Sequence, residues 1–402
     1  MGIVVQKFGG SSVADAKKIF NVAGRIADTY NEGNDVVVVV SAMGDTTDDL
    51  IEKAREINDK ASRREMDVLL STGEQITISL LAMALEKMGY PVISLTGWQV
   101  AMITDSNNQK ARLKNIQTER ILSELDKKKI VVVAGFQGVN EYNDITTLGR
   151  GGSDTTAVAI AAAVKADVCE IYTDVDGVYT TDPRIVKNAK KLNDISYDEM
   201  LELASLGANV LHNRSVELAK KYNVNMEVKS SFEKVDGTKV KEVGLVEKML
   251  VRGVARDNDV ARISIMGIPD EPGKAYRVFD LLAKNNISVD IILQSIGRDN
   301  TKDISFTVCM DQLDEAVKVI NENLELLGAK EVKSRSDISK VSIVGAGMAS
   351  NPGVAAKMFE ALYDAQINIH MISTSEIKVS VLINEKNAEK AVEVIHDKFF
   401  NN

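Results

Sequence analysis

The strongest constraint on the fold of this chain is a regular alternation of short apolar runs and longer helix-forming stretches. The apolar runs, mostly rich in Val and Ile, lie at residues 3–6, 36–40, 91–95, 130–134 and 170–172. The helix-forming stretches lie at residues 15–31, 64–87 and 108–127. Such alternation predicts a parallel sheet with helices on both faces, because parallel strands are joined by long crossover connections. We expect this α/β core to run to about residue 245.

The rest of the chain contains an internal repeat. Residues 261–295 match residues 339–375, and Pro272-Gly273 of the first copy aligns with Pro352-Gly353 of the second. Each copy continues with a further strand and an amphipathic helix, so each reads strand–helix–strand–strand–helix. This order predicts two ferredoxin-like units of the βαββαβ type.

The strands of the two copies do not balance. The first copy has a candidate last strand at residues 330–334, whereas the second shows none after its final helix at residues 388–399. A spare strand at residues 250–255 precedes the first copy. We predict that this spare strand completes the sheet of the second copy. The expected domains are residues 1–245, 246–337 and 338–402.

Charge, cysteine and histidine content exclude several classes of protein. The chain has 49 Lys and Arg against 58 Asp and Glu, a net charge of −9, which argues against a nucleic-acid-binding protein. Cys169 and Cys309 form no CxxC pair and the three histidines form no HxH or HExxH pattern, so we expect neither a disulfide framework nor a zinc site. Without a run of about 18 apolar residues or a secretion signal, we expect no membrane span and a cytoplasmic location.

The first candidate site is the run Lys7-Phe8-Gly9-Gly10-Ser11-Ser12, which follows an expected strand and precedes a helix that begins near Asp15. Glycines let backbone amides approach an anion, and a helix N-terminus adds favourable partial charge. Lys7 adds a full positive charge suited to a phosphoryl group in transfer. The alternative is a plain strand-to-helix turn with a surface lysine.

The second candidate is the run TLGRGGSDTT at residues 147–156, a glycine-rich turn that leads into an Ala-rich helix at residues 157–165. Arg150 can hold a carboxylate through two parallel hydrogen bonds. Ser153 or Asp154 could instead simply cap the helix. Two anion-type turns in one α/β core favour the two ends of a phosphoryl-transfer site.

Further candidates follow other strand ends. The run TDVDGVYTTDPR at residues 173–184 follows a predicted strand, and ligands of such sheets bind at the carboxyl ends of the strands; the alternative is a solvated loop. Ser41 and Thr47 lie just after another strand. Glu74 lies near the start of an apolar helix, where it could pair with a substrate ammonium group or simply favour the helix dipole.

Jointly these motifs resemble those of the aspartate kinases, which have the amino-acid kinase fold. The resemblance rests on KFGGSS at 7–12, VVVVSAMG at 37–44, STGE at 71–74, GRGGSDTTA at 149–157 and YTDVDGVYTTDPR at 172–184. The paired units of the tail resemble ACT domains, which bind free amino acids. The resemblance covers essentially the whole chain and implies a monofunctional enzyme.

The resemblance implies transfer of the ATP γ-phosphoryl group to the β-carboxylate of L-aspartate, the first step of lysine, threonine and methionine biosynthesis. Mg²⁺ would bridge the phosphates, with no metal ligand assigned to the protein. Lys7 and Asp154 would be catalytic, Arg150 would grip the α-carboxylate of aspartate, and Glu74 its ammonium group. The implied ATP-binding residues are Lys7, Phe8, Gly9, Gly10, Ser11, Thr173, Asp174, Tyr179, Asp182 and Arg184. The implied aspartate-binding residues are Ser41, Thr47, Glu74, Arg150, Gly151, Gly152 and Ser153.

The resemblance also implies feedback control by lysine, threonine or both. The implied effector-binding residues are Asp270, Gly273, Ala275 and Gln294 of the first unit and Asn368, Ile369, Ser375 and Glu376 of the second. A homo-oligomer formed through the ACT-like units is expected. Two alternatives remain at this point: another amino-acid kinase of the same fold, and a non-catalytic amino-acid sensor.

Overall fold

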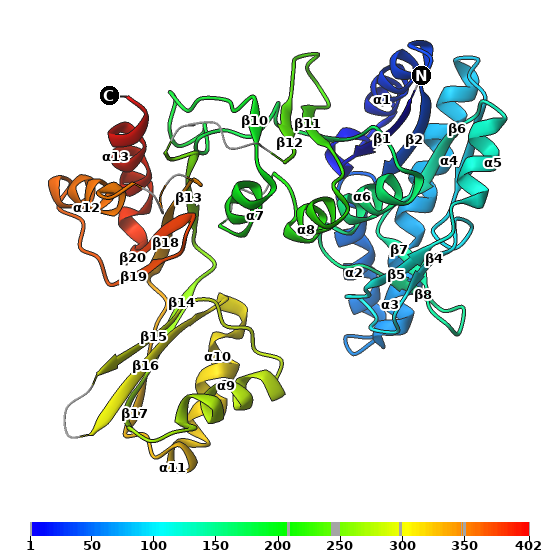
Figure 1. Ribbon diagram of the computed structural model, residues 1–402. Helices are drawn as coiled ribbons and strands as arrows, with labels where there is room; N and C mark the ends of the chain where they lie inside the picture. Colours follow the sequence, from blue (N-terminus) through cyan, green and yellow to red (C-terminus); the bar gives the residue numbers. More distant parts are fainter. Residues whose placement is uncertain are drawn as a thin grey trace. The chain divides into compact units, whose positions relative to one another are not determined.

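The computed structural model describes residues 2–206, 210–242, 250–296, 300–346, 348 and 351–401. These residues form two compact units (Figure 1). The first unit contains residues 2–179, 190–205 and 210–242. The second contains residues 180–189, residue 206 and the described residues from 250 onward.

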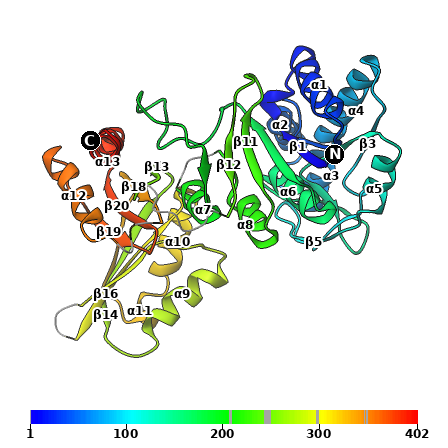
Figure 2. The ribbon, with the colours of Figure 1, turned by 45° about the horizontal axis from the view of Figure 1, so that its top comes forward.

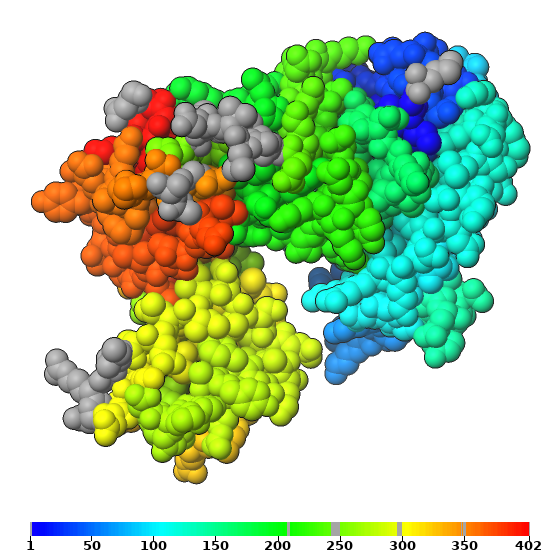
Figure 3. Space-filling view, in the orientation of Figure 1, coloured from blue at the N-terminus to red at the C-terminus, as the bar shows by residue number. Residues whose placement is uncertain are grey.

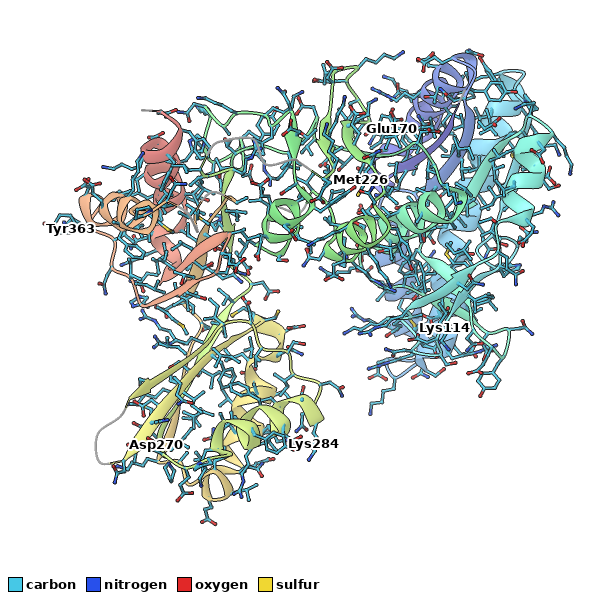
Figure 4. All side chains as sticks on the ribbon, in the orientation of Figure 1. Lys114, Glu170, Met226, Asp270, Lys284 and Tyr363 are labelled. Carbon is cyan, nitrogen blue, oxygen red and sulfur yellow. The ribbon has the colours of Figure 1, made fainter. Side chains whose placement is uncertain are left out.

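The core of the first unit is a parallel sheet, as predicted. Its parallel strands, in spatial order, are β3 (Val92–Leu95), β6 (Ile130–Ala134), β2 (Asp35–Val40), β1 (Ile3–Phe8), β9 (Val168–Thr173) and β11 (Met226–Ser230). The antiparallel β12 (Thr238–Val240) and the edge strand β10 (Asp194–Ile195) complete it. All five strands expected in this core are present. Glu170 of β9 and Met226 of β11, labelled in Figure 4, belong to neighbouring strands.

Helices cover both faces of this sheet (Figure 2). On one face, α1 (Ala16–Asn31) and α4 (Thr72–Lys87) pack against Val36, Val38 and Val40 of β2. On the other face, α6 (Gly152–Val164) packs against β1, β2 and β9. Because side chains of a strand alternate between faces, Phe8 points toward α1 and α4 while Lys7 points toward α6.

The helix expected at residues 64–87 is divided into two. It forms α3 (Arg63–Leu70) and α4, which meet at Ser71, whose carbonyl accepts a hydrogen bond from Gln137 Nε2 at 2.9 Å. By length and composition alone, residues 63–87 could cross a membrane. However, Ile78, Leu81 and Leu85 are buried in the sheet–helix core, which is typical of a core helix.

The helix expected at residues 108–127 is wrong over most of its length. Residues Leu113–Ile116 form strand β5, and only Glu119–Asp126 form a helix, α5. Strand pairing overrides the helix propensity of the Lys-, Arg- and Gln-rich stretch here. β5 lies at the edge of a small sheet with β4 (Met102–Thr104), β7 (Gln137–Val139) and β8 (Ile145–Thr147), in the order β5-β4-β7-β8.

Three further helices complete the first unit. They are α2 (Thr46–Ile57), α7 (Tyr197–Ser205) and α8 (Asn213–Tyr222). Of these, α8 packs against α6, next to the second glycine turn.

The tail forms the two predicted ferredoxin-like bodies, the yellow and the orange-to-red parts of Figure 3. The first has the strand order β15 (Ile292–Ile296), β16 (Thr301–Val308), β14 (Ala261–Pro269) and β17 (Glu331–Arg335), with helices α9 (Lys274–Lys284), α10 (Leu313–Asn321) and the short α11 (Leu324–Leu327). The second has the strand order β19 (Met371–Thr374), β20 (Lys378–Asn384), β18 (Ile338–Val344) and β13 (Gly253–Asp257), with helices α12 (Val354–Asp364) and α13 (Ala388–Phe400).

The spare strand pairs as predicted. β13 lies antiparallel to β18 over Gly253–Asp257, so it takes in the second sheet the place that β17 takes in the first. Residues 250–252, also expected in this strand, precede it. The two ferredoxin-like bodies are therefore interleaved in sequence.

One segment of the expected catalytic region belongs to the C-terminal unit. Thr180–Ala189 clusters with that unit, and the carbonyl of Thr180 accepts a hydrogen bond of 2.7 Å from Val254 N. Thr180 Oγ1 lies 2.9 Å from His396 Nε2, and Val186 is buried in the core of the second ferredoxin-like body. The catalytic region expected at residues 1–245 is therefore interrupted at Thr180–Ala189, which belongs to the C-terminal unit.

Candidate active site

The centre of the site is an ion pair between Lys7 of β1 and Asp154 of α6. Lys7 Nζ lies 2.6 Å from Asp154 Oδ1. The two side chains keep 11% and 12% of their surface exposed, so the pair is nearly enclosed but still open to a ligand. A cation held at the carboxyl end of a parallel strand can stabilise negative charge that develops there.

The first glycine turn beside Lys7 is built by main-chain hydrogen bonds. Gly9 N donates to Tyr172 O at 3.4 Å, and Gly44 N donates to Gly10 O at 3.0 Å. A Cβ on Gly10 would lie 2.7 Å from the carbonyl oxygen of Ala42, so only glycine fits this turn. The neighbouring strand ends therefore set the shape of the turn.

This glycine turn does not itself begin helix α1. Residues Gly10–Ser12 form one separate turn of 3₁₀ helix, and α1 begins only at Ala16, after Asp15. The Asp15 side chain accepts a hydrogen bond from Lys18 N and so caps α1 itself. The turn therefore offers its own main chain and Lys7 to an anion, and the contribution of the α1 N-terminus, which begins near Asp15 as expected, stays a prediction.

Two residues next to the turn differ in what they can offer a ligand. Phe8 is fully buried and stacks on Tyr172 with ring centroids 4.6 Å apart, so only its main chain is left for a nucleotide. Ser11 is exposed.

Ser12, next in sequence, ties the turn to the rest of the sheet. Its hydroxyl donates to Ser231 Oγ at 2.8 Å, and Ser231 Oγ donates to the carbonyl of Thr173 at 2.9 Å. This link joins the first glycine turn to the ends of β9 and β11. Ser231 is not among the predicted site residues, although it directly follows a strand, Met226–Ser230, whose residues alternate between buried and half-buried.

Glu74 contacts the turn that follows β2, at Ala42. It stands in the first turn of α4 and is 3% exposed. Its Oε1 accepts a hydrogen bond of 3.0 Å from Ala42 N, while its buried Oε2 has no partner among the described residues. Burial raises the pKa of Glu74 to about 8. A buried carboxylate oxygen without a partner fits a cationic group of a ligand.

The second glycine turn enters α6 in a left-handed conformation. Gly149 and Gly151 have φ of 79° and 67°, and Gly151 precedes the first helical residue without any side-chain cap. α6 thus begins at Gly152, five residues before the predicted start. The alternative that Ser153 or Asp154 caps the helix is wrong.

The remaining substrate candidates follow strands β2 and β8 in the sequence. Arg150, between the two left-handed glycines, is exposed. Ser153 is 7% exposed, and a Cβ on Gly135, just after β6, would lie 2.7 Å from its Oγ. Ser41 N donates to Phe8 O at 3.1 Å, and Thr47 stands half-buried in the first turn of α2.

The third motif is divided between the two units. In the first unit, Thr173 Oγ1 donates to Asp174 Oδ1 at 3.0 Å, and Tyr179 Oη donates to Asp176 Oδ1 at 2.8 Å. Burial and this hydrogen bond raise the pKa of Tyr179 to about 12. Asp182 and Arg184 belong to the C-terminal unit, where they form an ion pair of 2.8 Å.

The first ferredoxin-like body of the tail contains a hollow of about 200 Å³. All four effector residues predicted in the first body line this hollow: Asp270, Gly273, Ala275 and Gln294. Asp270, labelled in Figure 4, follows β14 and pairs with Lys302 at 2.7 Å. The four residues predicted in the second body, Asn368, Ile369, Ser375 and Glu376, do not line it.

Comparison with known families matches residues 2–230 to the amino acid kinase family and residues 263–324 and 341–399 to the ACT domain. The fold and site thus define an amino acid kinase with paired ACT domains. An aspartokinase of Bacillus sp. (strain MGA3) is 54% identical over 400 residues, which cover 99% of this chain and 97% of that protein. The chain belongs to the aspartokinases.

Solved structures support the same assignment. Aspartokinase III of E. coli in complex with aspartate and ADP has a TM-score of 0.85 at 26% identity, and the match covers 99% of this chain and 100% of that one. The same enzyme in complex with lysine and aspartate has a TM-score of 0.77 at 26% identity, covering 99% of each chain.

Proposed function

We propose that this chain transfers the γ-phosphoryl group of ATP to the β-carboxylate of L-aspartate, which gives 4-phospho-L-aspartate and ADP. The observation that carries this proposal is the Lys7–Asp154 ion pair, nearly enclosed at the carboxyl edge of the sheet beside a turn that only glycine fits. Membership of the aspartokinases supports aspartate as the acceptor.

The reaction needs no general base. A free aspartate side chain has a pKa of about 3.9, so its carboxylate is already ionised at neutral pH. The task is to bring two anions together in line, which calls for positive charge and oriented amides. Lys7 supplies the charge at the γ-phosphoryl group, and the main chain of Gly9, Gly10 and Ser11 holds the phosphates.

Mg²⁺ fits this site as an ion carried on the ATP phosphates. Among the described residues, no three His, Cys, Asp or Glu side chains gather to hold a metal ion by themselves. Mg²⁺ bound to phosphates needs only one or two protein carboxylates, and Asp154 is the carboxylate beside Lys7. When bound, the ion would offset the charge of the phosphates.

The nucleotide side of the site uses the ends of β9 and the loop beyond it. Thr173, Asp174 and Tyr179 belong to the first unit, with Thr173 linked through Ser231 to the glycine turn. Asp182 and Arg184, also predicted to bind the nucleotide, belong to the C-terminal unit.

Aspartate is held by groups of opposite charge. Its ammonium group pairs with the partnerless Oε2 of Glu74, and its α-carboxylate with the guanidinium of Arg150. Ser41, Thr47 and Ser153, together with the main chain of Gly151 and Gly152, surround the acceptor carboxylate.

The hollow in the first ferredoxin-like body binds a feedback amino acid, lysine or threonine. Asp270 offers a carboxylate to its ammonium group, and the main chain at Gly273 and Ala275, where α9 begins, faces its carboxylate. Lysine bound to E. coli aspartokinase III supports an amino-acid effector.

The protein assembles with further copies of itself through the ferredoxin-like sheets. β15 and β19 are edge strands, and they expose apolar side chains: Leu293 is 45% exposed and Ile372 is 43% exposed. Exposed apolar edge strands favour pairing with another chain. Asn368 and Ile369, next to β19, then contact an effector from a facing copy. The free thiols of Cys169 and Cys309 accord with a cytoplasmic location.

The test is an ATP- and Mg²⁺-dependent assay that traps the acyl phosphate with hydroxylamine. We expect hydroxamate with L-aspartate and none with L-glutamate, and a lower yield when lysine, threonine or both are added. Product with glutamate instead would overturn the substrate. Absence of product with any amino acid would favour a non-catalytic sensor.

The effector site is tested in the same assay. Asp270→Ala should abolish inhibition and leave uninhibited turnover unchanged, because Asp270 lies in the regulatory unit. Asp314→Ala, at the start of α10 and outside the hollow, is the matched control and should keep inhibition. Inhibition that survives Asp270→Ala would move the effector elsewhere.

A further inference from the structure

A buried carboxylate outside the predicted site holds the backbone next to the second glycine turn. Asp67 of α3 has 0% of its surface exposed. Its Oδ1 accepts a hydrogen bond of 2.7 Å from Thr147 Oγ1, and its Oδ2 one of 2.7 Å from Asn108 Nδ2. Both oxygens lie 3.1 Å from Gln109 N. A carboxylate buried among three donors fixes all three, because leaving any donor unpaired is costly.

Gln109, whose N–H donates to both oxygens of Asp67, has a strained backbone. Gln109 has a φ of 67°, a left-handed conformation that a residue with a side chain rarely adopts. Such a conformation costs free energy and persists only where the surroundings enforce it. The double hydrogen bond from Gln109 N to Asp67 is that enforcement.

Gln109 in turn packs against the second glycine turn. A Cβ on Gly149 would lie 2.8 Å from the carbonyl oxygen of Gln109, so the two backbones are in close contact. Gly149 directly precedes Arg150. The path from Asp67 to Arg150 therefore runs through two left-handed residues in contact.

Arg214 holds the same backbone through a second set of bonds. From α8, its Nη1 donates to Leu148 O at 3.0 Å and its Nη2 donates to Ala111 O at 2.8 Å. Ala111 N also donates to Thr147 O at 3.0 Å. The rigid guanidinium fork thus ties the two segments, residues 109–111 and 147–149, to each other.

We propose that Asp67 and Arg214 are positioning residues that set the place of Arg150, and thereby the affinity for aspartate. The inference rests on the proposed role of Arg150 as the clamp on the α-carboxylate. Neither residue touches the substrate in this account. Both act on residues 147–148, just before Gly149, and on residues 108–111, which pack against Gly149. Hydrogen bonds to charged groups are stronger than those between neutral groups.

The experiment measures KM for aspartate, KM for ATP and kcat in a set of variants. Asp67→Ala should raise the aspartate KM about tenfold or more, since it leaves three donors unpaired. Arg214→Met should raise it by about tenfold, and Thr147→Val, which removes one hydroxyl only, by about threefold. In each variant the ATP KM should stay within about twofold, because the first glycine turn has its own main-chain bonds.

Two further variants separate positioning from general stability. Asp67→Asn should recover an aspartate KM near that of the wild type, because the amide of Asn108 can turn over and accept from the new –NH₂ group. Glu124→Ala is the matched control: Glu124 of α5 is 4% exposed as a side chain and pairs with Lys127 and Lys129, which follow that helix. It should lower the melting temperature and leave the aspartate KM unchanged.

The outcomes are distinct. An aspartate KM that rises alone in the Asp67 and Arg214 variants supports the inference. An unchanged aspartate KM, or aspartate and ATP KM values that rise together, overturns it. If Asp67→Ala does not fold, the aspartate KM and ATP KM of Thr147→Val and Arg214→Met test the same inference. Arg150→Ala is measured in parallel: if its aspartate KM equals that of the wild type, the role of Arg150 in the proposed function fails and takes the inference with it.

Discussion

The two glycine turns of the catalytic unit are held in place by different means. The first turn, at Gly9 and Gly10, is fixed by main-chain hydrogen bonds to neighbouring strand ends. The second, at Gly149 and Gly151, rests on the side chains of Asp67 and Arg214 through the backbone around it. The difference follows from the sheets: β1 lies between β2 and β9 in the large sheet, whereas β8 is an edge strand of the small one.

This difference matches what each turn has to recognise. Phosphates are common to all nucleotides and can be held by main-chain amides, which the central strands place without help from side chains. One particular amino acid must be recognised by the placement of a single guanidinium group, and side chains can adjust that placement. We therefore expect changes at the first turn to reduce turnover and changes around the second turn to reduce affinity for aspartate.

The largest effect is expected at Lys7, the charged residue of the first turn. Lys7→Ala should lower kcat by about a thousandfold or more, because it removes the positive charge from the γ-phosphoryl group. The circular dichroism spectrum should remain that of the folded protein. Lys220→Ala, which removes an exposed lysine on α8, is the control and should leave kcat unchanged. A near-normal kcat for Lys7→Ala would remove Lys7 from the mechanism.

The next largest effect is expected at Gly10, where main chain alone shapes the turn. Gly10→Ala should lower kcat by about a hundredfold, because its Cβ would lie 2.7 Å from a backbone oxygen that cannot move aside without shifting the turn. Gly24→Ala is the matched control, since a Cβ there meets nothing within 4 Å. In the interior of α1 it should raise stability by about 0.5–1 kcal/mol at unchanged kcat. Equal activity of the two variants would contradict the account of the first turn.

These two positions also show which parts of the fold and the site can be predicted from the sequence. The strand-then-glycine pattern is local, so the first turn, its lysine and the parallel core could be predicted from the residues alone. The roles of Asp67, Arg214 and Ser231 could not be predicted, because their hydrogen-bond partners lie far away in the sequence and no local sequence pattern indicates them. The helix expected at residues 108–127 failed because pairing with β4 makes Leu113–Ile116 a strand. Asp67, distant in sequence, holds the strained turn at Gln109.

Glu74 holds the main chain at Ala42, beside the first turn, and its proposed role in aspartate binding can be tested by pH. With a pKa of about 8 in the free enzyme, Glu74 is protonated at neutral pH and must lose that proton to pair with an ammonium group. Hence kcat/KM for aspartate should rise with pH up to about 8. Glu74→Gln should remove this rise and lower kcat/KM about tenfold above that pH. The same pH profile in wild type and variant would exclude Glu74 from aspartate binding.

Stability provides an independent measurement on the same variant. Burial raises the pKa of Glu74 from 4.5 to about 8, so the folded state holds the proton more tightly than the unfolded state. The contribution of protonated Glu74 to the free energy of unfolding is therefore fully present below pH 4.5 and is lost as the pH rises toward 8. Glu74→Gln, which cannot ionise, should melt above the wild type at pH 8 and close to it below pH 4.5. Melting curves without ligand at the two pH values decide this.

The smallest effect is expected at Ser231, the side-chain link of the first turn. Its hydroxyl joins Ser12 to the carbonyl of Thr173, yet the turn also has its main-chain bonds to Tyr172 and Gly44. Ser231→Ala should therefore raise the ATP KM only about threefold and leave the aspartate KM unchanged, since a single neutral hydrogen bond contributes about 1 kcal/mol. Ser205→Ala, which removes an exposed hydroxyl on α7, is the control. If Ser231→Ala lowered kcat by about a hundredfold, as expected for Gly10→Ala, side chains would hold the first turn as well. The contrast between the two turns would then fail.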